Sequence, residues 1–158
     1  MNDLDHPTWI LGLSQTAGRG RRGRQWVNPD GNFSATLVLF PQESPETLAL
    51  RSFVASLALI EALGILTGCS DKFSLKWPND VLLNSGKMAG ILLESLQLDT
   101  GQKALSIGVG VNLIDAPGLS KVEANATPPV ALFTETGVRI SPEQLLDCFA
   151  NCYVNYEV

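Results

Sequence analysis

The stretch KMAGILLESLQLDTGQKALSIGVGVNLI, residues 87–114, decides the fold of this chain. It contains two apolar-rich runs, KMAGILLESLQL (87–98) and KALSIGVGVNLI (103–114), which the polar DTGQ (99–102) separates. Two such runs with a glycine-containing turn between them are typical of paired antiparallel strands. The stretch therefore predicts a β-hairpin.

Further strands and helices are expected on both sides of this hairpin. Four strands are predicted from shorter apolar runs: TWILGLSQ (8–15), FSATLVLF (33–40), FSLKW (73–77) and DVLLN (80–84). Three helices are predicted: one from Ser44 to about Gly64–Gly68, a short one over 129–136 and one from Ser141. Hairpins and separate helices without βαβ alternation indicate an α+β fold, with a mixed or antiparallel sheet and helices packed on one face.

The two longer predicted helices begin with a serine followed by a proline. Ser44 and Ser141 fit N-caps, the prolines after them fit the first helical position, and Gln144 fits a capping-box partner. Apolar residues at helical spacing should form the buried face of the first helix: Leu50, Phe53, Val54, Leu57, Ile60 and Leu63. Trp77 is also expected in the core, and residues 115–129 are expected to form a loop.

The composition is typical of one domain with a hydrophobic core. Of 158 residues, 45% are hydrophobic and 17% are charged, which argues against disorder. The longest apolar run, 53–66, is interrupted by Glu61 and is shorter than the roughly 20 residues of a membrane span, so no membrane partner is expected. MNDLDHP (1–7) does not resemble a signal peptide. Three cysteines without a CxxC pair favour a reduced, cytoplasmic protein: Cys69, Cys148 and Cys152.

The segment AGRGRRGRQW (17–26) concentrates positive charge. It holds four arginines, and without them the net charge would fall from −5 to −9: Arg19, Arg21, Arg22 and Arg24. Positive charge confined to one loop suits a small anion better than a nucleic-acid backbone, so nucleic acid is not expected as a partner. A solvated basic loop without a ligand is the alternative. The G-x-G-x-x-G spacing in this loop is accidental, because the following RQWVNPDGN (24–32) contains a turn and cannot start the helix of a dinucleotide site.

Three segments resemble the catalytic domain of the biotin protein ligase, or biotin–[acetyl-CoA-carboxylase] ligase, family: SQTAGRGRRGRQW (14–26), KWPNDVLLNSGKMAGILLE (76–94) and IGVGVNL (107–113). With their spacing they cover nearly the whole chain. The resemblance implies a fold like that of the class II aminoacyl-tRNA synthetases. It also implies an enzyme that activates biotin with ATP and Mg²⁺ to biotinyl-5′-AMP and transfers it to a lysine of the biotin carboxyl carrier protein of acetyl-CoA carboxylase.

The resemblance also implies roles for individual residues. The expected biotin-binding residues are Gln15, Arg19, Gly20, Arg21, Lys87, Gly90, Leu92, Gly108 and Gly110. Among these, Lys87, Arg19 and Arg21 are expected to be catalytic, with Lys87 bridging the biotin carboxylate and the α-phosphate. The expected ATP-binding residues are Trp26, stacked on adenine, Asn112 at the adenine edge, and Asn79 and Asp80 at the triphosphate, with Asp80 as a Mg²⁺ ligand.

The chain departs from the family pattern at both ends. Residues 1–158 are expected to be one incomplete catalytic domain, without the upstream Ser-Thr-Asn segment, an N-terminal helix-turn-helix or the C-terminal β-barrel domain. The alternatives are a non-catalytic biotin- or nucleotide-binding paralogue and a relative of the lipoyl or octanoyl transferases. The octanoyl enzymes use a cysteine nucleophile, but no cysteine here lies in a motif loop. The edges of the 87–114 hairpin also leave open a homodimer.

Overall fold

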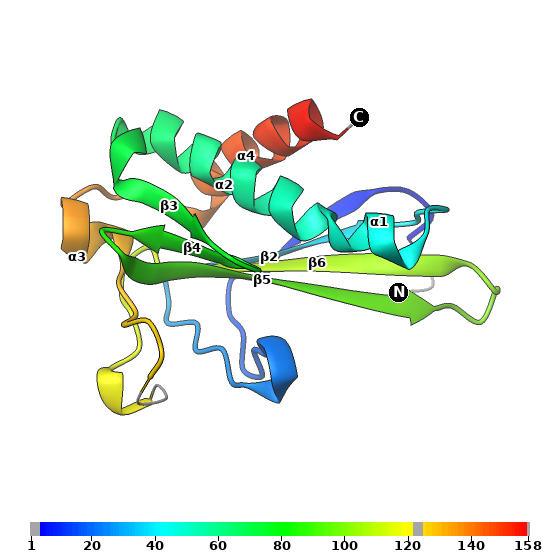
Figure 1. Cartoon of the computed structure of the whole chain (residues 1–158), viewed down its shortest axis with the longest axis horizontal. Helices are drawn as coiled ribbons and strands as arrows, with labels where there is room; N and C mark the ends of the chain where they lie inside the picture. The colour runs from blue at the N-terminus through cyan, green and yellow to red at the C-terminus, as the bar shows by residue number, and fades with distance from the viewer. Residues whose placement is uncertain (1–3, 122–124, 158) are drawn as a thin grey trace.

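The computed structural model describes residues 4–121 and 125–157, so part of the predicted 115–129 loop lies outside the described residues. A six-stranded sheet in the order β1-β2-β6-β5-β4-β3 carries the longer helices on one face (Figure 1). The strands are β1 (Thr8–Leu11), β2 (Phe33–Leu39), β3 (Phe73–Lys76), β4 (Asp80–Leu83), β5 (Gly86–Gln97) and β6 (Lys103–Val111). The helices are α1 (Pro45–Ala49), α2 (Arg51–Thr67), α3 (Leu132–Thr136) and α4 (Pro142–Tyr156). The predicted α+β class is confirmed, and the strands of the sheet pair antiparallel.

The predicted hairpin is the pair β5–β6, which runs in register from Ala89 opposite Val111 to Gln97 opposite Lys103. Side chains alternate between the two faces of a strand. Ile91 and Val109 are therefore on the helix side, where they belong to the buried core. The residues next to them, Gly90 and Leu92 on β5 and Gly108 and Gly110 on β6, are on the opposite side of the sheet.

The predicted buried face of helix α2 is confirmed only in part: Val54 and Ile60 are partly buried against the core. Leu63 is buried, but Leu50, Phe53 and Leu57 have exposed fractions of 58%, 37% and 43%. The buried positions are mostly small: Ala55, Ser56, Ala58, Leu59, Ala62 and Leu63. Small side chains allow a helix to approach its neighbours closely, so this face packs on the sheet and α4, whereas Leu50, Phe53 and Leu57 lie outside it.

The predicted helix over 44–68 is two helices, because the helix breaks at Leu50 between α1 and α2. Ser44 caps α1 as predicted, and Gly68 ends α2 in the left-handed conformation at φ 70°. Residues 45–67 together are long and apolar enough to cross a membrane by length and composition. Core helices of soluble proteins meet the same test, and the small face of α2 belongs to the core here.

Two other boundaries differ from the predictions. Strand β1 ends at Leu11 instead of residue 15, after which Gly12 N still donates to Ser34 O at 2.8 Å. Helix α3 begins at Leu132 instead of residue 129, because residues 128–130 are extended beside Lys87. In that segment Lys87 N donates to Pro128 O at 2.8 Å and Val130 N donates to Lys87 O at 2.9 Å.

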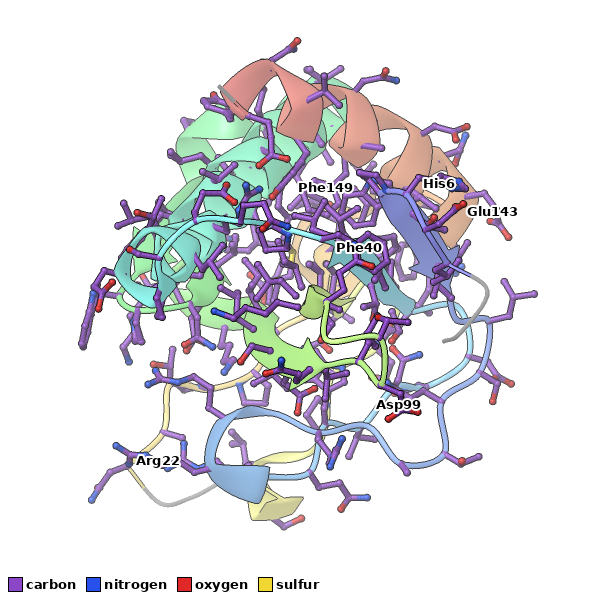
Figure 2. All side chains as sticks on the ribbon, turned by 90° about the vertical axis from the view of Figure 1, so that its right-hand side faces the viewer. His6, Arg22, Phe40, Asp99, Glu143 and Phe149 are labelled. Atoms are coloured by element: carbon purple, nitrogen blue, oxygen red, sulfur yellow. The ribbon has the colours of Figure 1, made fainter. Side chains whose placement is uncertain are left out.

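Helix α4 begins with the predicted capping box, in which Gln144 N donates to Ser141 Oγ and Ser141 N donates to Gln144 Oε1. The helix packs its aromatic residues between β1 and α2. Phe149 is fully buried, and its ring centroid lies 5.0 Å from that of Trp9 and 6.4 Å from those of Phe33 and Tyr153 (Figure 2). This aromatic cluster joins the last helix to the first two strands.

Replacing Phe149 by alanine is expected to lower the free energy of unfolding by about 3–5 kcal/mol, because it removes a buried ring and leaves a cavity. Chemical denaturation measures the loss. Val154→Ala is the control on the same helix, since Val154 is 67% exposed, and it should change stability by no more than about 0.5 kcal/mol. Equal, small effects of both substitutions would contradict the role of the cluster.

Candidate active site

The predicted motif residues gather on the outer face, which we define as the sheet face opposite α2 and α4. The floor of this face consists mostly of residues with small side chains. Two rows of paired residues cross β2, β6 and β5 in that order: Ser34, Gly110 and Gly90, and next to them Thr36, Gly108 and Leu92. The chain between β1 and β2, which contains the arginines, lies on this side of the sheet (Figure 1). The outer face is thus a shallow floor covered by a charged loop.

Trp26 rests on two glycines of this floor. A Cβ built on Gly110 would lie 2.5 Å from Trp26 Nε1, and one on Gly90 would lie 3.4 Å from the same ring. Only glycine leaves room for the indole at Gly110. The two glycines predicted to line the biotin pocket therefore contact Trp26 directly, and the indole itself forms part of the surface offered to a ligand.

The arginine segment folds back on itself. Trp26 N donates to Gly18 O at 2.9 Å, Gly20 N donates to Arg24 O at 2.7 Å, and Arg22 has a φ of 58°. The four arginine side chains are exposed, and Figure 2 shows Arg22 pointing outward at the end of the segment. Arg19 Nη2 lies 3.8 Å from Glu94 Oε1 on β5, and Arg21 Nη1 donates to Asn79 Oδ1, in the connection between β3 and β4, at 3.5 Å.

Lys87 and Asp80 form an ion pair beside Trp26. Lys87 Nζ lies 2.8 Å from Asp80 Oδ1 and 6.0 Å from the centroid of the Trp26 ring. The two side chains are 32% and 19% exposed. Asp80 is at the start of β4, opposite Gly90, and Lys87 follows the tight connection to β5. The pair is neutral overall, but it fixes the Lys87 ammonium group at the edge of the glycine floor, where that group can donate to a carboxylate or a phosphate.

The asparagines of the motifs are held by the backbone. Asn79 Nδ2 donates to Ile91 O at 2.5 Å, so together with its contact to Arg21 both ends of its amide are engaged. Asn112 is 2% exposed, and its Nδ2 donates to Val130 O at 3.1 Å. Within the described residues the buried polar atoms without a partner include Trp26 Nε1, which lies on the floor, Asn112 Oδ1, two residues after Gly110, and Asn28 Oδ1. Unpaired buried polar atoms are costly and are often satisfied by a ligand.

The structure brings most of the predicted site residues together. Gln15 Oε1 accepts from Ser34 Oγ at 3.2 Å, which places Gln15 at the end of the floor formed by β2. Lys87, Asp80 and Trp26 meet at the other side, as described above. Trp77 was predicted in the core, and this was wrong: it is 78% exposed, because it follows the edge strand β3 and no element packs over it among the described residues.

Sequence reasoning missed Asn32, Asn28 and the extended segment 128–130. Asn32 is among the buried polar residues, and in the sequence it looked like part of a turn. Residues 128–130 were predicted as the end of a loop followed by the first turn of a helix, whereas in the structure they are extended beside Lys87. None of these residues lies in a recognised motif. Asn32 and residues 128–130 make their contacts with the backbone of distant residues, which only the fold reveals.

The cysteines lie on the helix side of the sheet. Cys69 follows α2, and Cys148 and Cys152 are on α4, with no disulfide among them. Burial raises the pKa of the Cys152 thiol to about 11, which leaves it protonated at neutral pH. None of the three is placed to act as a nucleophile on the outer face.

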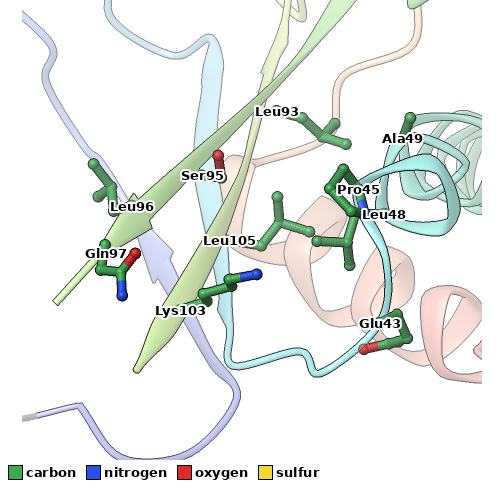
Figure 3. A pocket seen from close by; sticks show the side chains of 10 residues that line it. All are labelled: Glu43, Pro45, Leu48, Ala49, Leu93, Ser95, Leu96, Gln97, Lys103 and Leu105. Carbon is green, nitrogen blue, oxygen red and sulfur yellow. The ribbon is translucent and has the colours of Figure 1, made fainter. Parts of the chain in front are cut away.

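Two surface hollows lie away from the floor. One of about 500 Å³ is on the helix side, between α1 and the far end of the hairpin, with Leu48, Leu93, Lys103 and Leu105 among its lining residues (Figure 3). The other, of about 200 Å³, lies between α2 and β3 and reaches Asn79 and Asp80. Within the described residues no group of three or more His, Cys, Asp or Glu side chains is arranged to hold a metal ion.

The chain belongs to the biotin/lipoate A/B protein ligase family, whose family model matches residues 1–112. This confirms the family expected from the motifs. More particularly, the chain is 51% identical over 154 residues to the biotin–[acetyl-CoA-carboxylase] ligase of Paracoccus denitrificans. This alignment covers 98% of this chain and 64% of that protein. The chain thus spans slightly less than two thirds of the length of this relative.

Solved structures agree with the fold. The biotin protein ligase from Aquifex aeolicus in complex with biotin and ATP matches with a TM-score of 0.79 at 29% identity, over 98% of this chain and 62% of that one. The biotin protein ligase from Leishmania major in complex with biotinyl-5-AMP matches with a TM-score of 0.76 at 25% identity, over 96% of this chain and 65% of that one.

Gly110→Ala is expected to displace Trp26 and loosen the arginine segment, because the new Cβ would lie 2.5 Å from the indole. Gly108→Ala is the matched control, since the atom nearest to its Cβ is Leu92 O at an ordinary 3.6 Å. Limited digestion with trypsin measures the difference. Cleavage at the exposed arginines should be faster in Gly110→Ala than in the wild type and Gly108→Ala, and equal rates would show that the indole does not hold the segment.

Proposed function

We propose that this chain activates biotin with ATP and transfers the biotinyl group to a lysine of the biotin carboxyl carrier protein of acetyl-CoA carboxylase. The observation that carries the proposal is the Lys87–Asp80 pair beside Trp26 on the glycine floor, under the arginine segment. The arrangement combines a flat apolar surface for a ring with fixed cations for a carboxylate and phosphates. The relatives described above support the choice of biotin and ATP.

In the first step a biotin carboxylate oxygen bonds to the α-phosphorus of ATP, and the bond from that phosphorus to the bridging oxygen breaks to release pyrophosphate. Negative charge gathers on the α-phosphate, and Lys87 Nζ is positioned to stabilise it. In the second step the amine of the carrier lysine attacks the carbonyl of biotinyl-5′-AMP, AMP leaves, and the amine proton passes to solvent. Positioning and charge account for this chemistry, so no enzyme nucleophile is required.

The remaining residues divide between the two substrates. Gln15, Leu92 and Gly108 would bind the biotin rings, Gly90 and Gly110 would support the Trp26 indole that rests on them, and Trp26 and Asn112 would bind adenine. Arg19, Gly20 and Arg21 would close over both substrates. Mg²⁺ binds through one or two carboxylates together with phosphate oxygens, and Asp80, with Asn79 beside it, offers the carboxylate for such a site. The ion would neutralise phosphate charge when bound.

The open edge of β5 is the surface that we propose for a partner strand, either from the carrier protein or from a second copy in a homodimer. Strand β4 pairs with β5 only up to Gly90, so among residues 4–121 and 125–157 no strand pairs with that side of β5 from residue 92 to residue 97. Sedimentation velocity at increasing concentration would detect the homodimer, and a constant monomer would exclude it.

Three free cysteines are consistent with a reduced, cytoplasmic location.

Lys87→Ala is expected to reduce adenylation about a hundredfold while biotin binding weakens less, because removing a preorganised charged donor costs on the order of 3 kcal/mol in the transition state. Biotin-dependent release of pyrophosphate from ATP measures the rate, and calorimetry measures biotin affinity. Lys103→Ala, a lysine at the far end of the hairpin, is the control for lost charge. Unchanged pyrophosphate release in Lys87→Ala would remove this residue from the mechanism, and no release by the wild type would refute the proposed function.

Arg21→Gly is expected to leave adenylate synthesis partly intact but to let biotinyl-5′-AMP escape, because Arg21 would hold the segment closed over the phosphate. Incubation with biotin, ATP and a bystander protein with exposed lysines measures the escape as biotin on the bystander. Arg22→Gly is the matched control, since Arg22 points outward and already has a positive φ. A bystander that stays unlabelled while adenylate forms at the normal rate would contradict this containment role.

A further inference from the structure

Asn32 holds the chain that leaves β6. It directly precedes β2 and is 2% exposed. Its Oδ1 accepts from three consecutive backbone amides, those of Leu113 at 3.0 Å, Ile114 at 2.8 Å and Asp115 at 3.2 Å. Its Nδ2 donates to Asp115 O at 2.7 Å. We call this set of four hydrogen bonds the Asn32 clamp.

The clamp begins one residue after Asn112, which is itself held by its backbone. Asn112 N donates to Met88 O at 2.8 Å, and Asn112 O accepts from Leu132 N at 2.9 Å. On the other side of Asn112, Val111 pairs with Phe33, the residue next to Asn32. Asn112 therefore lies between two fixed points of the backbone. Phe33 holds the preceding residue through the β2–β6 pairing, and Asn32 holds the following residues through the clamp.

The orientation of the Asn112 side chain follows from its partner. Because Nδ2 donates to Val130 O, a flipped amide would bring Oδ1 against that carbonyl oxygen, so the flip is disfavoured. The atom left without a partner is the buried Oδ1, which can only accept a hydrogen bond. It lies two residues along the chain from Gly110, on which Trp26 rests. A purine ring stacked on Trp26 would present its edge in this region.

We propose that Asn32 is a positioning residue that fixes Asn112 Oδ1 as an acceptor, so that the preference of the proposed ATP site for a 6-aminopurine over a 6-oxopurine depends on Asn32. The inference rests on the proposed function, because it takes the outer face to bind ATP. A 6-amino group donates to the free oxygen. A 6-oxo group would place a second acceptor against it, and the amide cannot turn to offer its NH₂ while Val130 O holds that group. Selectivity thus comes from the rigidity of Asn112, which the Asn32 clamp maintains.

The test compares ATP with GTP in binding and in biotin-dependent pyrophosphate release, using the whole chain. The wild type is expected to prefer ATP. In Asn32→Ala this preference should fall about tenfold, the equivalent of one neutral hydrogen bond, while the dissociation constant for biotin stays within about twofold. Asn32→Asp, which keeps the oxygen that accepts from the three amides, should retain most of the preference.

Several outcomes would overturn the inference. These are a wild type that binds both nucleotides equally, an unchanged preference in Asn32→Ala, and a parallel loss of ATP, GTP and biotin binding, which would indicate a purely structural role. If Asn32→Ala does not fold, Gly31→Ala serves instead, because its Cβ would lie 3.0 Å from Ile114 and disturb the clamp while Asn32 stays in place. A wild type that prefers ATP in binding but releases no pyrophosphate would refute the proposed function and leave the selectivity test standing.

Discussion

The register of β5 against β6 is the constraint on which the rest of the structure depends. Because side chains alternate along a strand, this register places aliphatic residues such as Ile91 and Val109 on one face and Gly90 and Gly110 on the other. The aliphatic face builds the core with α2, and the glycine face accepts Trp26. A slip of one residue would exchange the two faces, so the same register that stabilises the fold also forms the site.

The charged groups of the site are carried by elements of different rigidity. Lys87 is held at the start of β5 by backbone hydrogen bonds to Pro128 and Val130 on one side and by its ion pair with Asp80 on the other. The arginines, by contrast, have exposed side chains on a segment between β1 and β2 that Trp26 anchors to the glycine floor. Lys87 thus provides a positive charge at a fixed position, and the exposed arginines provide further positive charges that can adjust to a bound substrate. This combination suits a reaction in which substrates must enter and products must leave.

The fold was predictable where local chemistry and burial agree. The hairpin, the serine caps and the capping box follow from turn residues and hydrogen-bonding side chains that act over a few positions. Half of the predicted buried face of α2 and the place of Trp77 were predicted wrongly, because both depend on which tertiary neighbours are present. Apolar residues at helical spacing look alike whether a helix packs through leucines or through alanines. The motifs indicated most residues of the candidate site, but the Asn32 clamp could not be predicted, since its three amides are some eighty positions away in the chain.

The position of the arginine segment makes the molecule electrically asymmetric. Four exposed cations occupy one segment on the outer face, and the rest of the chain carries a net charge of −9. An anion in solution is therefore repelled by most of the surface and attracted by one region, which steers its diffusion toward the floor and orients it before contact. Added salt shortens the range of both the repulsion and the attraction. The segment thus acts on a substrate across a distance of several ångströms in water as well as through hydrogen bonds at the site.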